Sequence, residues 1–480
     1  MRNPTVRTSL PTWLVAPIAL VAVLSGAAPC LAQDDATTTR PLIEATGFDD
    51  AAFRFDSWAG WRILNSRNDS EYDNLVFGAG TYVSFSKWEV AVAFELAIRE
   101  GRIALRADDY NELGDYFHIL RRLQYSKKGE PRDRFFFRLG ELSGSSGTIG
   151  HGTIIDSYHS VADYNSRTIG MQIDLDFDTF GFETLVNSFS TWNTVGIRTW
   201  LKPGRFSEKP HPVLKDFAIG VTLAGDLDAP SVLTADGANI ALNGRRNILY
   251  TGKPLGLIGA DVDVPLVDVE TFQLATYADF VQIIDHGNGW FLGLRAAFEL
   301  PLWDTLPLEI FAEWQQLSRG FIPSYFDAFY EVERFAFPAL DSTTTRSAYL
   351  GLATPSPGFR VGLKWGVRRL VTFRGSFADY TTDRDNQLGR LMLEFGTAPD
   401  APLPFTLNVA WIKRGVSSFE DAFALDDRAM LRFTTTIGFG KDVPLRIGLT
   451  IDRLWRVRPT TGRYESFDVW FPWAGIGLSW

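Results

Sequence analysis

Several segments of this sequence alternate strictly between apolar side chains and polar or small ones. In the segment 88–99, Trp88 and Val90 fall on one face of an extended chain, and Glu89 and Ala91 fall on the other. The same alternation recurs in 168–177, 216–223, 306–315 and 445–452. A period of two residues is typical of β-strands whose two faces meet different surroundings. The pattern therefore predicts an all-β chain.

Strand length and spacing distinguish a membrane barrel from a soluble sandwich. Each predicted strand has about ten residues, enough to cross a bilayer at a tilt, and no apolar run after residue 32 is long enough for a transmembrane helix. The separators alternate between short ones, such as 86–87 and 178–179, and long ones, such as 143–167 and 225–255. This spacing is typical of barrels with short periplasmic turns and long extracellular loops. We predict a transmembrane antiparallel β-barrel of about 20 strands, within a range of 18–22.

The first residues have the features of a secretory signal peptide. Arg2 and Arg7 precede an apolar run over 13–24, and Ala32 ends a small-residue cleavage site. A positive part, an apolar part and a cleavable part in this order are typical of export signals. A membrane anchor is the alternative, but the apolar run is short for one. We expect a signal peptide at 1–32, a short periplasmic N-terminal segment at 33–52 and the barrel at 53–480.

Composition excludes several other classes of protein. The net charge of −10 excludes a general nucleic-acid binder. The single Cys excludes a disulfide framework and a zinc ribbon. The 15 Trp and 37 Phe fit a lipid-facing surface with aromatic girdles. The remaining alternative is a soluble, secreted all-β protein, which would need no detergent for extraction.

The end of the chain resembles the C-terminal assembly signal of outer-membrane barrel proteins of Gram-negative bacteria. Ile476, Leu478 and Trp480 alternate with small residues, and an aromatic residue closes the chain. Phe is commoner than Trp at that position in these proteins, and Pro472 interrupts the pattern. The resemblance covers the last strand only and matches no specific porin subfamily. It implies a location in the outer membrane, contact with outer-membrane lipid and insertion by the barrel-assembly machinery.

Charged residues on the non-apolar faces form two groups along the chain. If the apolar faces meet lipid, these residues line the lumen, and strands that are neighbours in sequence are neighbours in the barrel. We therefore expect a pore-lining acidic arc and a pore-lining basic arc, whose transverse field favours polar solutes. The alternative is that the charges pair across neighbouring strands as ordinary salt bridges. The acidic arc comprises Asp174, Asp176, Asp216, Asp261, Asp263, Glu309 and Glu313, and the basic arc comprises Arg360, Lys364, Arg374, Arg390, Arg432 and Arg446.

The loop 143–167 is rich in Gly and Ser but also contains apolar residues that can pack. It includes His151, Asp156, Tyr158 and His159. In position and character it resembles the constriction loop of general porins, a third extracellular loop that folds into the barrel. The resemblance implies that these four residues narrow the pore. A surface loop with Ser and Gly turns is the alternative.

The long loops also allow functions other than a constriction. Ser, His and Asp residues in 143–167 would suit a barrel hydrolase, but the Gly-x-Ser-x-Gly elbow is missing from the sequence, so we assign no catalytic residue. No His or Cys spacing predicts a metal site, so neither a metal nor another cofactor is expected. The loop 318–345 mixes aromatic and acidic residues, which can bind a sugar or a partner, or can pack on the barrel rim.

These observations favour a porin-like outer-membrane channel for passive passage of small polar solutes. The alternative is an outer-membrane barrel with a closed lumen whose long loops bind a surface ligand or partner. A barrel hydrolase is a third possibility. The sequence does not indicate a subunit interface.

Overall fold

A computed structural model describes most of the predicted barrel region. The predicted signal peptide (1–32) and periplasmic segment (33–52) lie outside the described residues. The described residues are 53–65, 75–99, 102–104, 119–125, 134–142, 147–162, 168–189, 191–207, 214–243, 247–269, 271–298, 308–340, 342–367, 370–381, 387–397, 405–439, 445–458 and 460–479.

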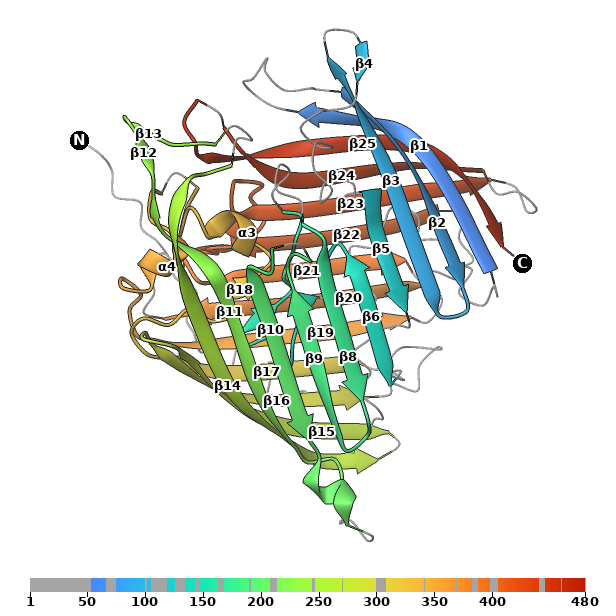
Figure 1. The fold of residues 1–480 in the computed structure, drawn as a ribbon. Helices are drawn as coiled ribbons and strands as arrows, with labels where there is room; N and C mark the ends of the chain where they lie inside the picture. Colours follow the sequence, from blue (N-terminus) through green and yellow to red (C-terminus); the bar gives the residue numbers. More distant parts are fainter. Residues whose placement is uncertain are drawn as a thin grey trace.

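Twenty antiparallel strands form a closed barrel, which confirms the predicted fold class and strand count. The first strand, β1 (Phe53–Asn65), pairs with β2 (Leu75–Phe85) and with the last strand, β25 (Tyr464–Ser479), so the sheet closes on itself (Figure 1). Closure gives every wall strand a hydrogen-bonded neighbour on both sides, as is required where the surrounding hydrocarbon offers no hydrogen bonds to the backbone. The other wall strands each pair with the next along the chain: β3 (Trp88–Arg99), β5 (Leu120–Tyr125), β6 (Phe135–Gly140), β8 (Gly170–Asp176), β9 (Phe180–Val186), β10 (Thr194–Leu201), β11 (Ala218–Leu233), β14 (Tyr250–Val269), β15 (Phe272–Ile283), β16 (Asn288–Phe298), β17 (Leu308–Leu317), β19 (Ser356–Val367), β20 (Val371–Tyr380), β21 (Arg390–Thr397), β22 (Phe405–Arg414), β23 (Ala429–Phe439) and β24 (Leu445–Val457).

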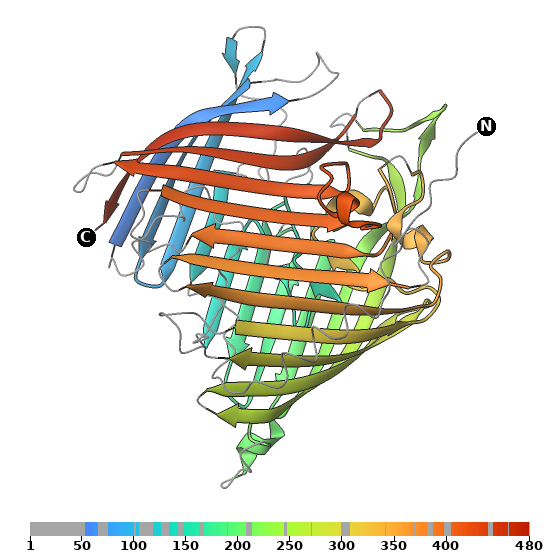
Figure 2. The same cartoon turned by 180° about the vertical axis from the view of Figure 1, so that it is seen from behind.

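The two rims of the barrel differ in their connections. β1 begins and β25 ends at the same rim, where Arg54 lies opposite Ser479. Several connections at this short-turn rim are tight where the structure describes them, and Ser86 and Asp178 adopt left-handed φ angles of 53° and 64° in two of them. The connection 202–217 at this rim contains the 3-10 helix η5 (Pro203–Phe206). Figure 2 shows the wall from behind, where the strands from β15 to β25 follow one another in chain order and each is antiparallel to the next.

Long connections gather at the opposite rim. They carry three short helices, α3 (Tyr330–Glu333), α4 (Arg346–Tyr349) and α5 (Phe419–Ala422), and the small strands β4 (Arg102–Ala104), β7 (Ile155–Asp156) and β18 (Phe326–Asp327). We call this the long-loop rim. Its two largest described connections lie between β6 and β8 and between β17 and β19.

The predicted long loop 225–255 is wrong in its length. β11 pairs with β10 only as far as Asp226, and β14 pairs with β15 only from Leu257, but β11 and β14 continue to pair with each other beyond these points. They form a two-stranded ribbon with register shifts near Ala229 and Pro230, where bulges accommodate residues that suggested a loop. Only 234–249 connects them, with the small hairpin β12 (Ala235–Asp236) and β13 (Asn239–Ile240).

The outer face of the wall is apolar and the inner face is polar or small. On β10 and β11, Ile197, Val221 and Leu223 are 41%, 46% and 52% exposed, whereas the alternating Arg198 and Thr222 are buried. An apolar outer surface of this extent is stable in lipid and unfavourable in water. The protein is therefore a transmembrane β-barrel.

No helix in the described residues is long and apolar enough to cross a membrane.

Large aromatic rings lie on glycines where the barrel closes. Trp58 on β1 and Trp473 on β25 are both buried. A Cβ built on Gly448, directly opposite Trp473, would lie 2.4 Å from the Trp473 ring, and one on Gly80 would lie 2.6 Å from the Trp58 ring. Glycine therefore makes room for each ring against the backbone of its neighbour. Along the same strand, β25 keeps its pairing through Pro472, Ile476 is exposed and Leu478 lies opposite Phe55, while Trp480 lies outside the described residues.

Candidate functional site

The loop 143–167, for which we keep the name constriction loop from the predicted role, folds into the barrel in its described part, 147–162. Ile154, Ile155 and Tyr158 are at most 3% exposed. They belong to one hydrophobic cluster with Leu257 of β14 and Val281 of β15. The apolar side chains of this Gly-rich loop thus pack against the barrel wall.

Two glycines orient the tip of the constriction loop. Gly150 and Gly152 flank His151 and have left-handed φ angles of 57° and 77°. Residues with a Cβ rarely adopt this conformation, so glycine permits the sharp turn. The Gly150 N–H donates to Glu183 on β9 at 2.9 Å, which fixes the tip against the wall.

His151 binds the acidic side of the lumen. Its Nδ1 lies 2.7 Å from Asp279 Oδ1, and its Nε2 lies 3.0 Å from Asp263 Oδ2. Burial would lower the pKa of His151, but Asp279 and Asp263 outweigh burial and the opposing charge of Arg295, and raise the pKa to about 9. The imidazole is therefore protonated at neutral pH, and both of its nitrogens donate to carboxylates.

Asp156 binds the basic side of the lumen. Its carboxylate accepts from Arg390 on β21 and lies 3.4 Å from Arg360 Nη1 on β19. Burial would raise the pKa of Asp156, but Arg390 and Arg360 outweigh it and lower the pKa to about 2. Arg360 also donates to the carbonyl of His151 at 2.9 Å, so one wall residue holds the loop at two points.

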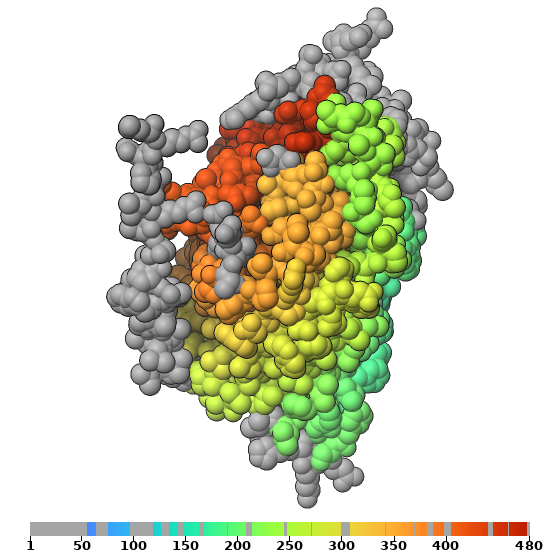
Figure 3. All heavy atoms as spheres, turned by 90° about the vertical axis from the view of Figure 1, so that its left-hand side faces the viewer, coloured from blue at the N-terminus to red at the C-terminus, as the bar shows by residue number. Residues whose placement is uncertain are grey.

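A second loop packs against the constriction loop. We call residues 318–355, between β17 and β19, the mouth loop. Its β18 pairs in parallel with β7, with Phe326 opposite Ile155 and Asp327 opposite Asp156. Phe321, Phe326 and Phe337 are fully buried. In Figure 3, the light orange atoms of the mouth loop lie between the green atoms of the two-stranded extension of β11 and β14 and the red atoms of the C-terminal strands.

Buried charges anchor the mouth loop. Arg346 lies 3.3 Å from Asp327 and 2.5 Å from Glu333, and Arg414 of β22 contacts both acids. Asp226 of β11 accepts from the Tyr330 hydroxyl at 2.6 Å. Buried charges are stable only when paired, so these contacts fix the loop in one arrangement.

Tyr158 and His159 connect the constriction loop to its surroundings. The Tyr158 hydroxyl donates to Glu331 of the mouth loop. His159 Nδ1 lies 3.3 Å from the Leu142 carbonyl. Burial, assisted by the charge of Arg432, lowers the pKa of His159 to about 4, so this imidazole is neutral and donates its Nδ1–H. The two histidines of one loop thus differ in charge.

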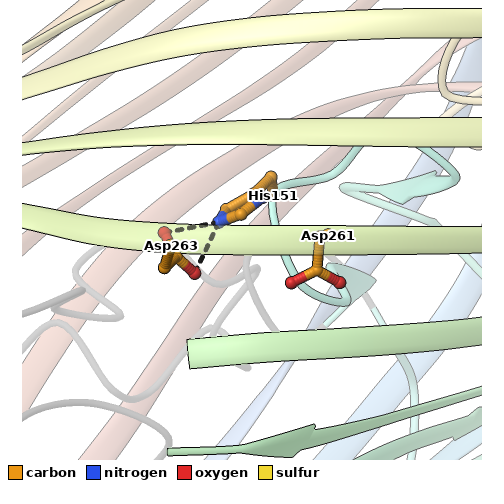
Figure 4. Close-up of side chains that lie close together, drawn as sticks. All are labelled: His151, Asp261 and Asp263. Carbon is orange, nitrogen blue, oxygen red and sulfur yellow. Dashed lines mark hydrogen bonds and ion pairs between the residues drawn. The ribbon is translucent and has the colours of Figure 1, made fainter. Parts of the chain in front are cut away.

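His151, Asp261 and Asp263 bring three metal-binding atoms within 4.8 Å of one another (Figure 4). Asp261, however, forms a two-point pair with Arg198, at 3.0 Å from Nε and 2.5 Å from Nη2. His151 is bound to acids through both nitrogens. The cluster is therefore an ion-pair network in which the cations are side chains.

The predicted acidic arc is distributed over several environments. Asp261, Asp263 and Glu313 face the constriction loop or its partners, and Glu313 accepts from the Tyr277 hydroxyl at 2.7 Å. Asp174 accepts the N–H of Thr184 and takes part in the β8–β9 contact. Asp176 accepts the N–H of Asp178 in a turn, and Asp216 lies before β11 and pairs with Arg205. Glu309 lies 3.3 Å from Lys364.

The predicted basic arc is paired as well. Arg360 and Arg390 bind Asp156, and Arg360 also lies 3.3 Å from Glu313. Three other pairs link neighbouring strands: Lys364 with Glu309, Arg374 with Glu394 at 3.8 Å, and Arg432 with Asp452 at 2.5 Å. Arg446 on β24 reaches Asp56 on β1 at 2.5 Å across the intervening strand β25. Two of the pairs, Glu309–Lys364 and Glu313–Arg360, join the edges of the two arcs.

Sequence reasoning missed several members of this network. Asp279 follows Tyr277 on the inner face of β15, where apolar and polar residues are mixed, so alternation gave no signal for it. Glu183 and Arg198 lie on strands that were correctly predicted, and their inward parity could have identified them. Asp327, Glu333 and Arg346 lie in a loop, where no periodicity predicts which way a side chain points.

Comparisons with known proteins give fold-level similarity only. No family model matches the chain, and no curated protein matches its sequence. Acinetobacter baumannii OccAB4 is 9% identical, with 89% of this chain and 97% of that chain covered and a TM-score of 0.31. Pseudomonas aeruginosa OccK11 is 10% identical, with 91% and 98% covered and a TM-score of 0.31. Wzi of Escherichia coli, described as a carbohydrate-binding β-barrel, is 9% identical, with 90% and 85% covered and a TM-score of 0.33.

Proposed function

We propose that this protein is an outer-membrane channel through which small polar solutes pass passively. The observation that carries the proposal is the position of the constriction loop, which enters the lumen and is held there by His151 on one wall and Asp156 on another. A loop held in this way narrows a barrel without sealing it by a separate domain. Inward charges on the remaining wall give the passage a polar surface, which disfavours apolar solutes.

The pairing of the wall charges supports a moderate selectivity for ion sign. Glu309–Lys364, Arg374–Glu394 and Arg432–Asp452 each combine opposite charges on neighbouring strands. Arg374 is the most exposed of the basic-arc residues in the ion pairs above, at 26% of its side chain. Its contact with Glu394 is also long, at 3.8 Å. Neutralising Arg374 should therefore shift ion preference towards cations more than neutralising Arg390, which is committed to Asp156.

A second candidate function is a closed barrel whose long-loop rim binds a surface ligand or partner. The observation that favours it is the apolar core between the two loops, in which Phe321, Phe326, Phe337 and Tyr330 are at most 1% exposed. A core of this kind blocks part of the lumen near β14 to β17. Under this function, solute passage is absent and the outer loop surface carries the activity.

Single-channel conductance of the mature chain, refolded in detergent and added to a planar bilayer, tests the proposal. A passive channel gives stable, ohmic current steps, which the same protein unfolded by heat does not give. Insertion without current, verified by heat-dependent migration of the inserted barrel, contradicts the channel and favours the closed barrel. In that case, binding at the long-loop rim becomes the function to measure.

A further inference from the structure

Arg295 differs from the other cations near the constriction loop because no described carboxylate lies within contact distance of it, although the charge of Asp263 is close enough to act on it. It lies on β16 with its side chain partly exposed, between the inward positions Gly293 and Ala297. Among the residues that the structure describes, none forms an ion pair or hydrogen bond with its guanidinium. Arg198, Arg360 and Arg390, by contrast, each bind a carboxylate. A cation without an acid on the inner wall is unfavourable unless water or a ligand satisfies it.

An aromatic ring fixes the orientation of Arg295. Its guanidinium carbon lies 4.6 Å from the centre of the Tyr277 ring. Tyr277 is itself held by its hydroxyl, which donates to Glu313 at 2.7 Å, and by the ring of His151 at a centroid distance of 4.1 Å. Contact with a ring uses the face of a guanidinium and leaves the N–H groups at its edges available.

Arg295 also lies close to the depth in the barrel at which His151 contacts the wall. Tyr277 is opposite Gly293, so Arg295 is two residues closer to the short-turn rim than the row that contacts His151. The charges of His151 and Asp263 act on Arg295. His151 binds both Asp263 and Asp279, and Glu313 accepts from the Tyr277 hydroxyl. Asp263, the acid whose charge acts on Arg295, is therefore bound by the constriction loop.

We propose that Arg295 is the anion-recognising residue of the channel and binds the carboxylate of small organic anions as they pass the constriction loop. This inference rests on the proposed channel function. A guanidinium binds a planar carboxylate through two parallel N–H···O hydrogen bonds, a geometry that a spherical halide cannot reproduce. Arg295 therefore favours carboxylates over chloride as well as anions over cations.

Reversal potentials in gradients of potassium acetate and of potassium chloride test this role. We expect Arg295→Gln to lower the permeability of acetate relative to potassium by roughly threefold or more, because one charge-assisted contact is lost. Arg295→Lys should keep the preference for anions over potassium but lose the preference for acetate over chloride. Arg319→Gln is the matched control, because Arg319 is an exposed arginine of the mouth loop whose side chain forms no ion pair with a described residue.

The outcomes separate the two proposals. A conducting wild-type channel in which Arg295→Gln and Arg319→Gln behave alike overturns the role of Arg295 and leaves the channel function intact. A wild-type barrel that inserts but does not conduct overturns both. If Arg295→Gln fails to fold, as judged by heat-dependent migration, the comparison of Arg295→Lys with wild type in acetate and chloride decides.

Discussion

His151 and Asp156 lie five positions apart in one loop and bind opposite charges on different parts of the barrel wall. His151 contacts Asp263 and Asp279 on β14 and β15, and Asp156 contacts Arg360 and Arg390 on β19 and β21. The loop thus places a cation against acids and an anion against bases. This complementarity explains why a Gly-rich segment adopts one position within the lumen.

The contact of His151 should weaken at high pH. Its pKa in the folded protein, about 9, lies above the ordinary value of 6.5, so protonation stabilises the docked loop. The contribution is complete below pH 6.5 and is lost as the pH rises through 9. We therefore expect the single-channel current to become noisier or larger as the pH rises from about 8 to about 10, a range centred on the pKa of His151.

Two histidine variants serve as controls for this pH effect. His151→Gln should abolish the change with pH, because no titrating group then joins the loop to the acidic wall. His159→Gln should retain it, because burial and Arg432 lower the pKa of His159 to about 4 and keep it neutral throughout that range. A pH profile that is unchanged in His151→Gln contradicts the assignment.

Asp156→Asn should destabilise the docked constriction loop strongly. The substitution leaves Arg390 and Arg360 near one another without the carboxylate between them, and breaking a buried ion pair on one side costs about 3–5 kcal/mol. Accelerated proteolysis of the loop in the folded barrel measures the effect. The double variant Asp156→Asn/Arg390→Gln should recover part of the loss, since the unpaired cation is then absent. Equal protection of wild type and Asp156→Asn would falsify this role.

Removal of most of the mouth loop should increase conductance. The Gly320 N–H donates to the Ala353 carbonyl at 3.0 Å, so the two ends of the loop lie side by side, and residues 321–352 can be replaced by a short Gly-Ser linker. The deletion removes the apolar core that fills the lumen near β14 to β17. We expect larger current steps with the same reversal potential. Silent insertion of the deleted barrel would instead indicate that the lumen is blocked elsewhere.

Gly448→Val should destabilise the barrel where it closes. A Cβ at Gly448 would lie 2.4 Å from the Trp473 ring, and overpacking of this kind costs about 1–3 kcal/mol. Gly438→Val on β23 is the matched control, because its added Cβ meets nothing within 4 Å. The free energy of unfolding by guanidinium in lipid vesicles measures both. A similar value for the two variants argues against steric contact as the reason for glycine at position 448.

The amino-acid sequence by itself determined the strands of this protein. Alternation such as that of Trp88, Glu89 and Val90 depends only on neighbouring residues, and short turns such as 86–87 fix where a strand reverses. These local features were sufficient to predict a closed antiparallel barrel of 20 strands and its apolar outer face. They failed at 225–255, where pairing of β11 with β14 continues through Pro230 by means of bulges.

Only the tertiary structure decided which charges meet. His151 reaches Asp279 across 128 positions and Asp263 across 112, and no local pattern specifies such a contact. The two arcs likewise seemed separate along the chain, but β17 pairs with β19, so Glu313 and Arg360 are neighbours. Loop residues such as Asp327 and Arg346 have no period that fixes their direction. Their positions follow from burial, because a charge within a packed lumen is stable only beside its partner.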